Sequence, residues 1–170
     1  VYKGIMKEKL RLILLEKGNY DMKIAFFGAG RSAVHMAETL AGMDDVEAYA
    51  VGARELERAE AFAEKYGFTK AYGSYEEMLA DKEIDLVYIA TPHSHHYKHA
   101  KMCLEAGKNV VTANKDLIAA DGHILLDTAA KNKKDFLHEA AVAGGIPIIR
   151  PIKQCLAGNH ISEVMGIMNG

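Results

Sequence analysis

The chain has 170 residues, enough for about one domain built from a twisted sheet and its helices. Hydrophobic residues make up 49% and charged residues 26%, which is typical of an ordinary globular protein and not of a disordered chain. The formal net charge of -2 gives no electrostatic reason to expect nucleic acid as a partner, and the apolar stretches are too short and too interrupted by charge to span a membrane. Neither nucleic acid nor a membrane is therefore expected as a partner, and association into a homo-oligomer is left open.

Residues 1–21 are expected to lie outside the domain. Their basic, leucine-rich stretch resembles a weak signal peptide, but it has no small-residue cleavage site, and a strand-like run follows at once. We interpret these residues as a non-native or frayed extension. Cys103 and Cys155 both fall in helix-like segments, which predicts buried, reduced thiols in a cytoplasmic protein.

Strand-like and helix-like segments alternate from residue 22 onward. In chain order, the pattern predicts a strand over 23–27, a helix over 32–41, a strand over 46–51, a helix over 55–66, a short strand near Ala71, a helix capped by Ser74, a strand over 85–90, a helix that ends at Gly107, a strand over 109–112, a helix over about 121–131 and a strand near 136–137. A Gly-Gly turn and a last helix–strand pair follow. Strands separated by helices of this length imply right-handed crossovers, so the predicted fold is α/β with a doubly wound parallel sheet.

A glycine-rich hexamer connects the first predicted strand to the first predicted helix. It has the pattern G-x-G-x-x-A and consists of Gly28, Ala29, Gly30, Arg31, Ser32 and Ala33. In this position the first glycine permits a tight turn, the second lets backbone amides approach a pyrophosphate, and the alanine lets the helix pack closely on the strand. The hexamer therefore predicts a Rossmann domain that binds a nicotinamide dinucleotide at a helix N-terminus, against the alternative of a glycine turn with no ligand.

The end of the second predicted strand indicates which dinucleotide binds. An enzyme that uses NAD usually carries a carboxylate there, about 20 residues after the glycine motif, to hold the ribose hydroxyls. This sequence has Ala53 and Arg54 instead. A guanidinium is the natural partner of a 2′-phosphate, so Arg54 favours NADP over NAD, unless it is simply a solvated residue at the start of the next helix.

The first two thirds of the domain resemble one known family. The matching segments are 24–33, 50–54, 72–79 and 89–96. From Met22 to about Asn109 the chain resembles the N-terminal domain of the glucose–fructose oxidoreductase family (Gfo/Idh/MocA), near its dihydrodiol dehydrogenase branch. The resemblance implies that Thr91, Pro92 and His93 lie beside the nicotinamide.

Four histidines in and after that loop, His93, His95, His96 and His99, also invite a metal interpretation. Because the later ones fall in a helix-like segment, their side chains should diverge, and packing beside the cofactor or contact with substrate is the favoured interpretation.

From Gly107 to the end the chain resembles homoserine dehydrogenase instead. The matching segments are 110–115, which contains Thr-Ala-Asn-Lys, and 139–151, 156–159 and 165–170. Both families could carry residues 105–110, so we interpret the chain as a hybrid joined at an equivalent strand, with a single divergent enzyme as the alternative. This resemblance implies that Lys115 is the catalytic lysine and that Asn114 lies beside the cofactor; the alternative for Lys115 is an ordinary surface residue.

The same resemblance implies a sodium site. It would be formed by Glu139, Val142, Gly144 and Ile146, since backbone oxygens can hold such a hard ion. The alternative is a plain glycine turn between strand and helix. Arg150, which precedes Pro151, is expected to begin a helix and not to bind substrate.

These features define three candidate functions and an expected domain plan. Residues 1–21 are the extension, 22–150 the dinucleotide-binding domain and 151–170 the start of a truncated substrate domain. The first candidate is the cofactor domain of a homoserine dehydrogenase-like enzyme that converts L-homoserine to L-aspartate 4-semialdehyde, inactive by itself because substrate needs a second wall. The second is a dehydrogenase of a sugar or a trans-dihydrodiol, and the third is a non-catalytic dinucleotide-binding module.

Overall fold

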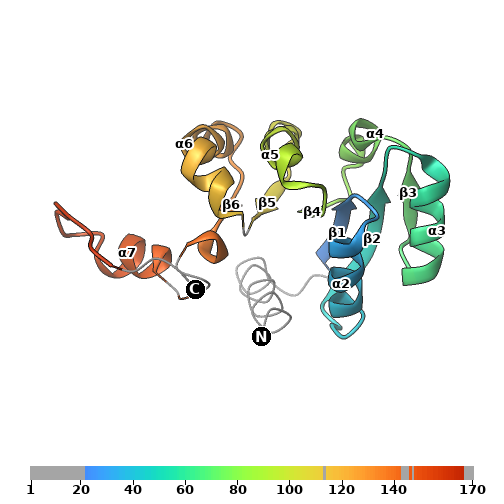
Figure 1. The fold of residues 1–170 in the computed structure, drawn as a ribbon, viewed down its shortest axis with the longest axis horizontal. Coiled ribbons are helices and arrows are strands. Elements are labelled where there is room, and N and C mark those ends of the chain that lie inside the picture. The colour runs from blue at the N-terminus through green and yellow to red at the C-terminus, as the bar shows by residue number, and fades with distance from the viewer. Residues whose placement is uncertain (1–21, 113, 143–145, 147, 167–170) are drawn as a thin grey trace.

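Six parallel strands form one sheet at the centre of the protein (Figure 1). The computed structural model describes the chain except residues 1–21, 113, 143–145, 147 and 167–170. The strand order is β3-β2-β1-β4-β5-β6, and every neighbouring pair is parallel. The strands are β1 (Met22–Phe27), β2 (Val46–Gly52), β3 (Lys70–Tyr72), β4 (Leu86–Ile89), β5 (Asn109–Val111) and β6 (Phe136–Leu137). The predicted doubly wound sheet is confirmed, and its order reverses between β1 and β4, where such sheets bind ligands.

Helices cover both faces of this sheet. They are α2 (Arg31–Leu40), α3 (Leu56–Tyr66), α4 (Tyr75–Ala80), α5 (His96–Glu105), α6 (Lys115–Lys131) and α7 (Ile149–Cys155), with 3₁₀ turns η1 (His93–His95) and η2 (Glu139–Ala141). The buried side chains of α2 and α3 join one apolar cluster, and those of α4, α5 and α6 join another. No helix in the described part of the chain is long and apolar enough to cross a membrane.

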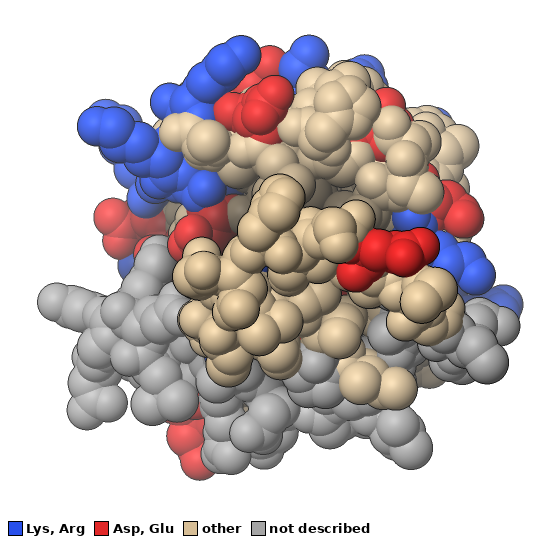
Figure 2. All heavy atoms as spheres, turned by 90° about the vertical axis from the view of Figure 1, so that its left-hand side faces the viewer, with Lys and Arg blue, Asp and Glu red and all other residues tan. Residues whose placement is uncertain are grey.

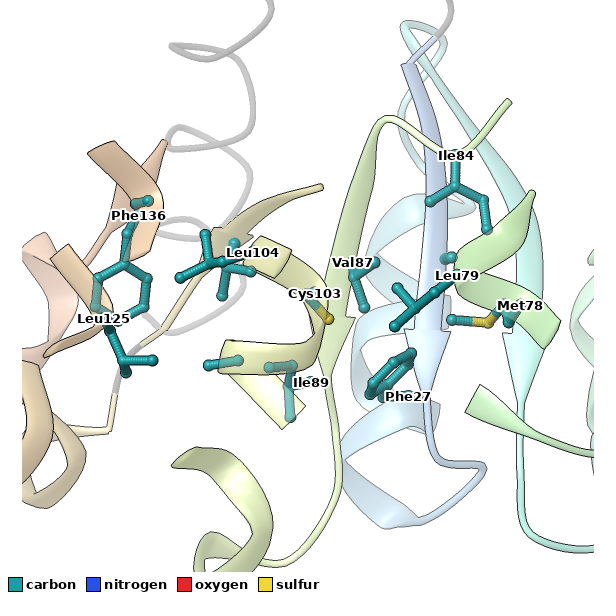
Figure 3. Close-up of a cluster of buried hydrophobic side chains, with 14 of the residues drawn as sticks. Phe27, Met78, Leu79, Ile84, Val87, Ile89, Cys103, Leu104, Leu125 and Phe136 are labelled. Atoms are coloured by element: carbon teal, nitrogen blue, oxygen red, sulfur yellow. The ribbon is translucent and has the colours of Figure 1, made fainter. Parts of the chain in front are cut away.

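The alternation of side chains along β1 builds the two clusters. Ile24 and Phe26 point into the cluster under α2 and α3, whereas Ala25 and Phe27 point into the one under α4, α5 and α6. Figure 3 shows Phe27 from β1 and Val87 from β4 facing the side chains of α4 and α5 in the second cluster. A strand buried on both faces must be apolar at every position, which explains the unbroken run that identified β1 in the sequence.

Helix α6 begins six residues earlier than the sequence pattern predicted. We expected it from about residue 121, but it begins at Lys115 and runs for 17 residues. The reason is the side chain of Asn114, whose Oδ1 accepts hydrogen bonds from the N–H groups of Asp116 at 3.1 Å and Leu117 at 3.2 Å. This cap satisfies the first turn, and Leu117 is buried against the sheet, so packing and capping together extend the helix.

Few of the described residues after β6 are buried against the sheet. Helix α7 has no buried residue, and Cys155 at its end is exposed, so the prediction of two buried thiols was wrong for Cys155 and right only for Cys103. Residues 156–166 form no strand, and the rest of the strand expected at 165–170 lies outside the described residues. Figure 2 views the molecule from the α7 side, where much of the surface carries neither acidic nor basic side chains.

A polar cluster ties α4 to the sheet through one carboxylate. Asp81 Oδ2 accepts hydrogen bonds from the hydroxyls of Tyr49 at 3.1 Å and Tyr72 at 2.8 Å, and from Lys70 Nζ at 2.7 Å. Burial alone would raise the pKa of the Asp81 carboxyl, but the hydrogen bonds from Lys70, the Glu83 amide and the tyrosines outweigh it, and the pKa lies well below its usual value. This cluster therefore holds a charged carboxylate in the native state at neutral pH.

Candidate cofactor site

The glycine hexamer forms the turn between β1 and α2 that the sequence predicted. Gly28 has a φ of +97°, a left-handed conformation that favours glycine, and its N–H donates to Gly52 O at 2.8 Å. A Cβ at Gly28 would lie 3.3 Å from Thr91 Cγ2, so the turn is tight as well as left-handed. Gly28 therefore sets the path of the chain at the switch point of the sheet.

Gly30 has a different environment. Its φ of -98° is open to any residue, and a Cβ placed there would meet no heavy atom of the described structure within 4 Å. It caps α2 with its backbone only, so no side chain satisfies the first N–H groups of that helix. Open space in front of unsatisfied amides is what a pyrophosphate requires, and Ala33, fully buried, lets α2 pack closely on β1.

Two arginines follow the end of β2, and the ring of Tyr75, the first residue of α4, lies against Gly52, where a Cβ would meet it at 3.2 Å. Arg54 is exposed directly after the strand, and Arg58 follows one turn into α3. Burial raises the pKa of the Tyr75 hydroxyl, and the positive charges of Arg54 and Arg58 oppose part of that rise. Sequence reasoning found Arg54 but missed Arg58 and Tyr75. Arg58 could have been found from its spacing, because it follows Arg54 by four residues at the start of a helix.

The loop after β4 is anchored by a buried histidine. Thr91 Oγ1 and His99 Nδ1 share a hydrogen bond of 2.8 Å, and the His99 ring lies edge-on to Phe27 and Tyr75 at centroid distances of 5.4 and 5.0 Å. Burial, followed by the nearby charges of His95 and Lys98, lowers the pKa of His99 to about 4, so the ring is neutral at physiological pH. His99 supports Thr91, and Thr91 packs on the glycine turn.

The expected divergence of the histidine side chains is only partial, because the His93 ring lies 5.1 Å from the His96 ring and the His95 ring 5.6 Å from the His99 ring, centroid to centroid. His93 and His95 are exposed on η1, and His96 turns back to the carbonyl of Thr91, with its Nε2 at 2.7 Å from that oxygen. Among the described residues, no group of three or more His, Cys, Asp or Glu side chains is arranged to hold a metal ion.

The Thr-Ala-Asn-Lys segment lies at the carboxyl end of β5. Thr112 is buried and its Oγ1 accepts from the Asn114 N–H at 3.2 Å, while Lys115 is exposed as the first residue of α6. Asn114, which we expected beside the cofactor, caps α6 and donates from Nδ2 to His96 Nδ1 at 3.3 Å. The fold thus brings the loop after β4 and the loop after β5 into direct contact.

The residues of the expected sodium site are only partly described. Both carboxylate oxygens of Glu139 accept backbone N–H groups at the start of α7, from Ile148 at 2.6 Å, Ile149 at 2.9 Å and Arg150 at 3.1 Å. The Glu139 carbonyl accepts from the Val142 N–H at 3.3 Å, and Gly144 lies outside the described residues. The contacts of Glu139 thus fit a helix cap, and they leave no carboxylate oxygen free of a donor for a cation. The sodium site stays a prediction.

Comparisons with known proteins agree with this geometry. The family model of the oxidoreductase family with an NAD-binding Rossmann fold, GFO_IDH_MocA, matches residues 22–138. A D-xylose 1-dehydrogenase (NADP(+)) of Hypocrea jecorina is 41% identical over 130 residues, which are 72% of this chain and 33% of that protein. A homoserine dehydrogenase of Lactococcus lactis is 40% identical over 118 residues, 69% of this chain and 27% of that one. A solved NAD-binding protein from Listeria innocua superposes with a TM-score of 0.57 at 31% identity, over 68% of this chain and 34% of that chain.

Both resemblances seen in the sequence are therefore confirmed, and each extends further than its motifs. The family match runs past residues 105–110, and the homoserine dehydrogenase match is longer than the segment from 107 to 170. The chain spans about a third of the length of the curated relatives it matches. With a Rossmann sheet, an open glycine turn at its switch point and a family match over residues 22–138, the chain belongs to the Gfo/Idh/MocA oxidoreductase family as an NAD(P)-binding domain.

Proposed function

We propose that this domain binds NADP in preference to NAD and serves a dehydrogenase that oxidises L-homoserine, with Lys115 as the acid–base residue. The observation that carries the proposal is the position of Lys115, which lies at the carboxyl end of β5, on the edge of the sheet where the glycine turn opens. When bound, the nicotinamide supplies the carbon that accepts or donates the hydride. The chain supplies the binding site and a group for the proton.

The preference for NADP rests on the charges at the tip of β2. Arg54 follows the end of β2, Arg58 lies in the first turn of α3, and Ala53 stands where an NAD enzyme usually has a carboxylate. Guanidinium groups at this position are donors suited to a phosphate dianion. A carboxylate, which would repel that phosphate, is absent from residues 51–54.

Titration of NADPH and NADH by fluorescence tests this preference. Arg54→Ala and Arg58→Ala should each remove a charge-assisted contact of about 1.5–3 kcal/mol, which is roughly a 10- to 150-fold loss of NADPH affinity, and should leave NADH affinity nearly unchanged. Lys82→Ala removes the same charge at the opposite edge of the sheet and should alter neither affinity. Equal affinity for the two dinucleotides in the unaltered protein would contradict the proposal.

The role of Lys115 is supported by its place in α6. The dipole of a helix disfavours a cation in the first turn by about 0.3–1 kcal/mol, so a lysine at the first position does not serve the stability of the helix. Lys115 is exposed and makes no hydrogen bond or ion pair with a described residue. It is therefore available to hold a substrate hydroxyl and to exchange a proton with it beside the nicotinamide.

Two observations favour different substrates. The segment from Thr112 to Lys115 resembles homoserine dehydrogenase, and a homoserine dehydrogenase is among the relatives. A D-xylose 1-dehydrogenase aligns over a similar share of the chain, which favours a sugar as the second candidate, with a trans-dihydrodiol as its variant. A dinucleotide-binding module with no reaction of its own is the third.

Fusion proteins separate these candidates. Residues 22–155 would replace the matching part of the Lactococcus lactis homoserine dehydrogenase and, in parallel, that of the Hypocrea jecorina D-xylose dehydrogenase. We expect oxidation of homoserine by the first fusion, lost in Lys115→Met while NADPH affinity is kept. Activity in the second fusion alone supports a sugar substrate, and NADPH binding without activity in either supports the third candidate. Homoserine oxidation that survives Lys115→Met contradicts the role of the lysine.

The compartment is part of the proposal as well. Cys103 and Cys155 are both free thiols, and Cys155 is exposed. An exposed free thiol is typical of a reducing environment, which favours the cytoplasm.

A further inference from the structure

A single side-chain hydrogen bond joins the loop after β4 to the first turn of α6. His96 Nε2 lies 2.7 Å from the carbonyl oxygen of Thr91, and its Nδ1 lies 3.3 Å from Asn114 Nδ2. A carbonyl oxygen can only accept, so Nε2 carries the proton, and Nδ1 then offers a lone pair to the Asn114 amide. Burial lowers the pKa of His96 by more than the hydrogen bond to the Thr91 carbonyl raises it, and the charges of His93 and His95 lower it further, which favours the neutral ring.

The orientation of the Asn114 amide is fixed from its other side. Its Oδ1 accepts hydrogen bonds from the backbone N–H groups of Asp116 and Leu117. The backbone N–H of Asn114 donates to Thr112 Oγ1. If the amide turned over, α6 would lose its cap. Nδ2 therefore has to point at His96, and the two contacts form a continuous chain from the Thr91 carbonyl to the residue that precedes Lys115.

This chain of contacts lies in one half of the sheet. The order reverses between β1 and β4, and each half of a doubly wound sheet holds one mononucleotide unit of a dinucleotide. The glycine turn and Arg54 belong to the half of β1, β2 and β3, which takes the adenosine end. His96 and Asn114 follow β4 and β5 and belong to the half that takes the nicotinamide end.

We propose that His96 is a positioning residue, which ties the Thr91 carbonyl to the cap of α6 and thereby sets the nicotinamide half of the site together with Lys115. This inference rests on the proposed function. It joins two segments that sequence reasoning assigned to different families, the Thr-Pro-His loop and the Thr-Ala-Asn-Lys segment. Neither segment by itself contains both partners of the bond.

Two ligands separate a positioning role from a purely structural one. NADPH occupies both halves of the site, whereas adenosine 2′,5′-bisphosphate occupies only the adenosine half. His96→Phe keeps the ring volume and removes both hydrogen bonds. Asn114→Ser keeps an oxygen to cap α6, which serine does well, and has no amide nitrogen to donate to His96 Nδ1. His123→Phe, an exposed histidine on α6, is the matched control.

We expect His96→Phe and Asn114→Ser each to lower NADPH affinity about tenfold and to leave the affinity for adenosine 2′,5′-bisphosphate within about twofold. The double variant should be no weaker than either single one. Equal losses for both ligands would show a structural effect and overturn the inference, as would unchanged NADPH affinity. If the unaltered protein binds neither ligand, the proposed function itself is wrong, which is a different outcome from a failure of the inference about His96.

Discussion

Replacement of Gly30 by valine tests whether the open turn holds the dinucleotide. A Cβ at Gly30 would meet no heavy atom of the described structure within 4 Å, and a φ of -98° is accessible to valine. The change should therefore leave the fold intact. Its cost is confined to helix capping, where glycine is better than valine by at most about 1 kcal/mol, equivalent to a melting temperature lower by about 2–4 °C.

The effect on binding should be much larger. The isopropyl group would occupy the space in front of the first turn of α2, where the N–H groups have no partner within the helix. If it keeps the pyrophosphate away from two of these donors, about 3–6 kcal/mol is lost at about 1.5–3 kcal/mol per charge-assisted hydrogen bond. That corresponds to a loss of affinity of at least about a hundredfold.

The assay is a fluorescence titration of NADPH with a melting curve of each variant. Gly42→Val is the matched control, because Gly42 lies just beyond the other end of α2 and a Cβ there would meet only Thr39 O, at 3.8 Å. We expect Gly42→Val to bind NADPH like the unaltered protein. If Gly30→Val also binds within about threefold of it while remaining folded, the assignment of the turn as the pyrophosphate site is refuted.

The other predictions concern stability. Gly28→Ala forces a side chain into the left-handed region at φ +97° and against Thr91, so it should cost about 1–2 kcal/mol; an unchanged melting temperature would disprove the strain. Asp81 has a pKa below its usual 3.8, so its stabilising effect is complete above that pH and is lost as the pH falls toward the native value. Chemical denaturation should show a steeper loss of stability below about pH 4 for the unaltered protein than for Asp81→Asn, and parallel curves would count against the cluster. Lys133 is the described non-glycine residue with a positive φ, 53°, at the end of α6, so Lys133→Gly should stabilise the domain by up to about 1 kcal/mol, and a lower melting temperature would contradict this. Glu139→Gln should weaken the cap of α7 and speed amide hydrogen exchange in its first turn, whereas unchanged exchange would mean that the cap contributes nothing.

The strands of the sheet, the glycine turn and several helix boundaries could be predicted from local sequence patterns. Strands buried on both faces must be apolar, amphipathic helices must repeat every three to four residues, and a turn at positive φ favours glycine, so each of these features is written locally. Ser74 was predicted as a cap, and its Oγ accepts the Glu77 N–H at 3.1 Å. Arg54 was likewise found from its place at the end of a strand.

The contacts between residues far apart in the chain could not be predicted in this way, because they depend on the three-dimensional fold. His96 and Asn114 are 18 residues apart in the chain and yet form a hydrogen bond. Thr91 and His99 are eight residues apart and share a hydrogen bond because α5 packs His99 beside the loop. Glu139 accepts a hydrogen bond from the backbone of Ile148, nine residues later. The start of α6 was missed for the same reason, because its first two turns depend on the Asn114 cap and on packing against the sheet. Cys155 was predicted to be buried because it lies in a helix-like segment. That segment does not pack against the sheet, so the thiol is exposed. The order of the strands in the sheet decides which side chains meet, and that order depends on the whole chain. Individual site residues could therefore be predicted from the sequence, but the hydrogen bonds between them could not.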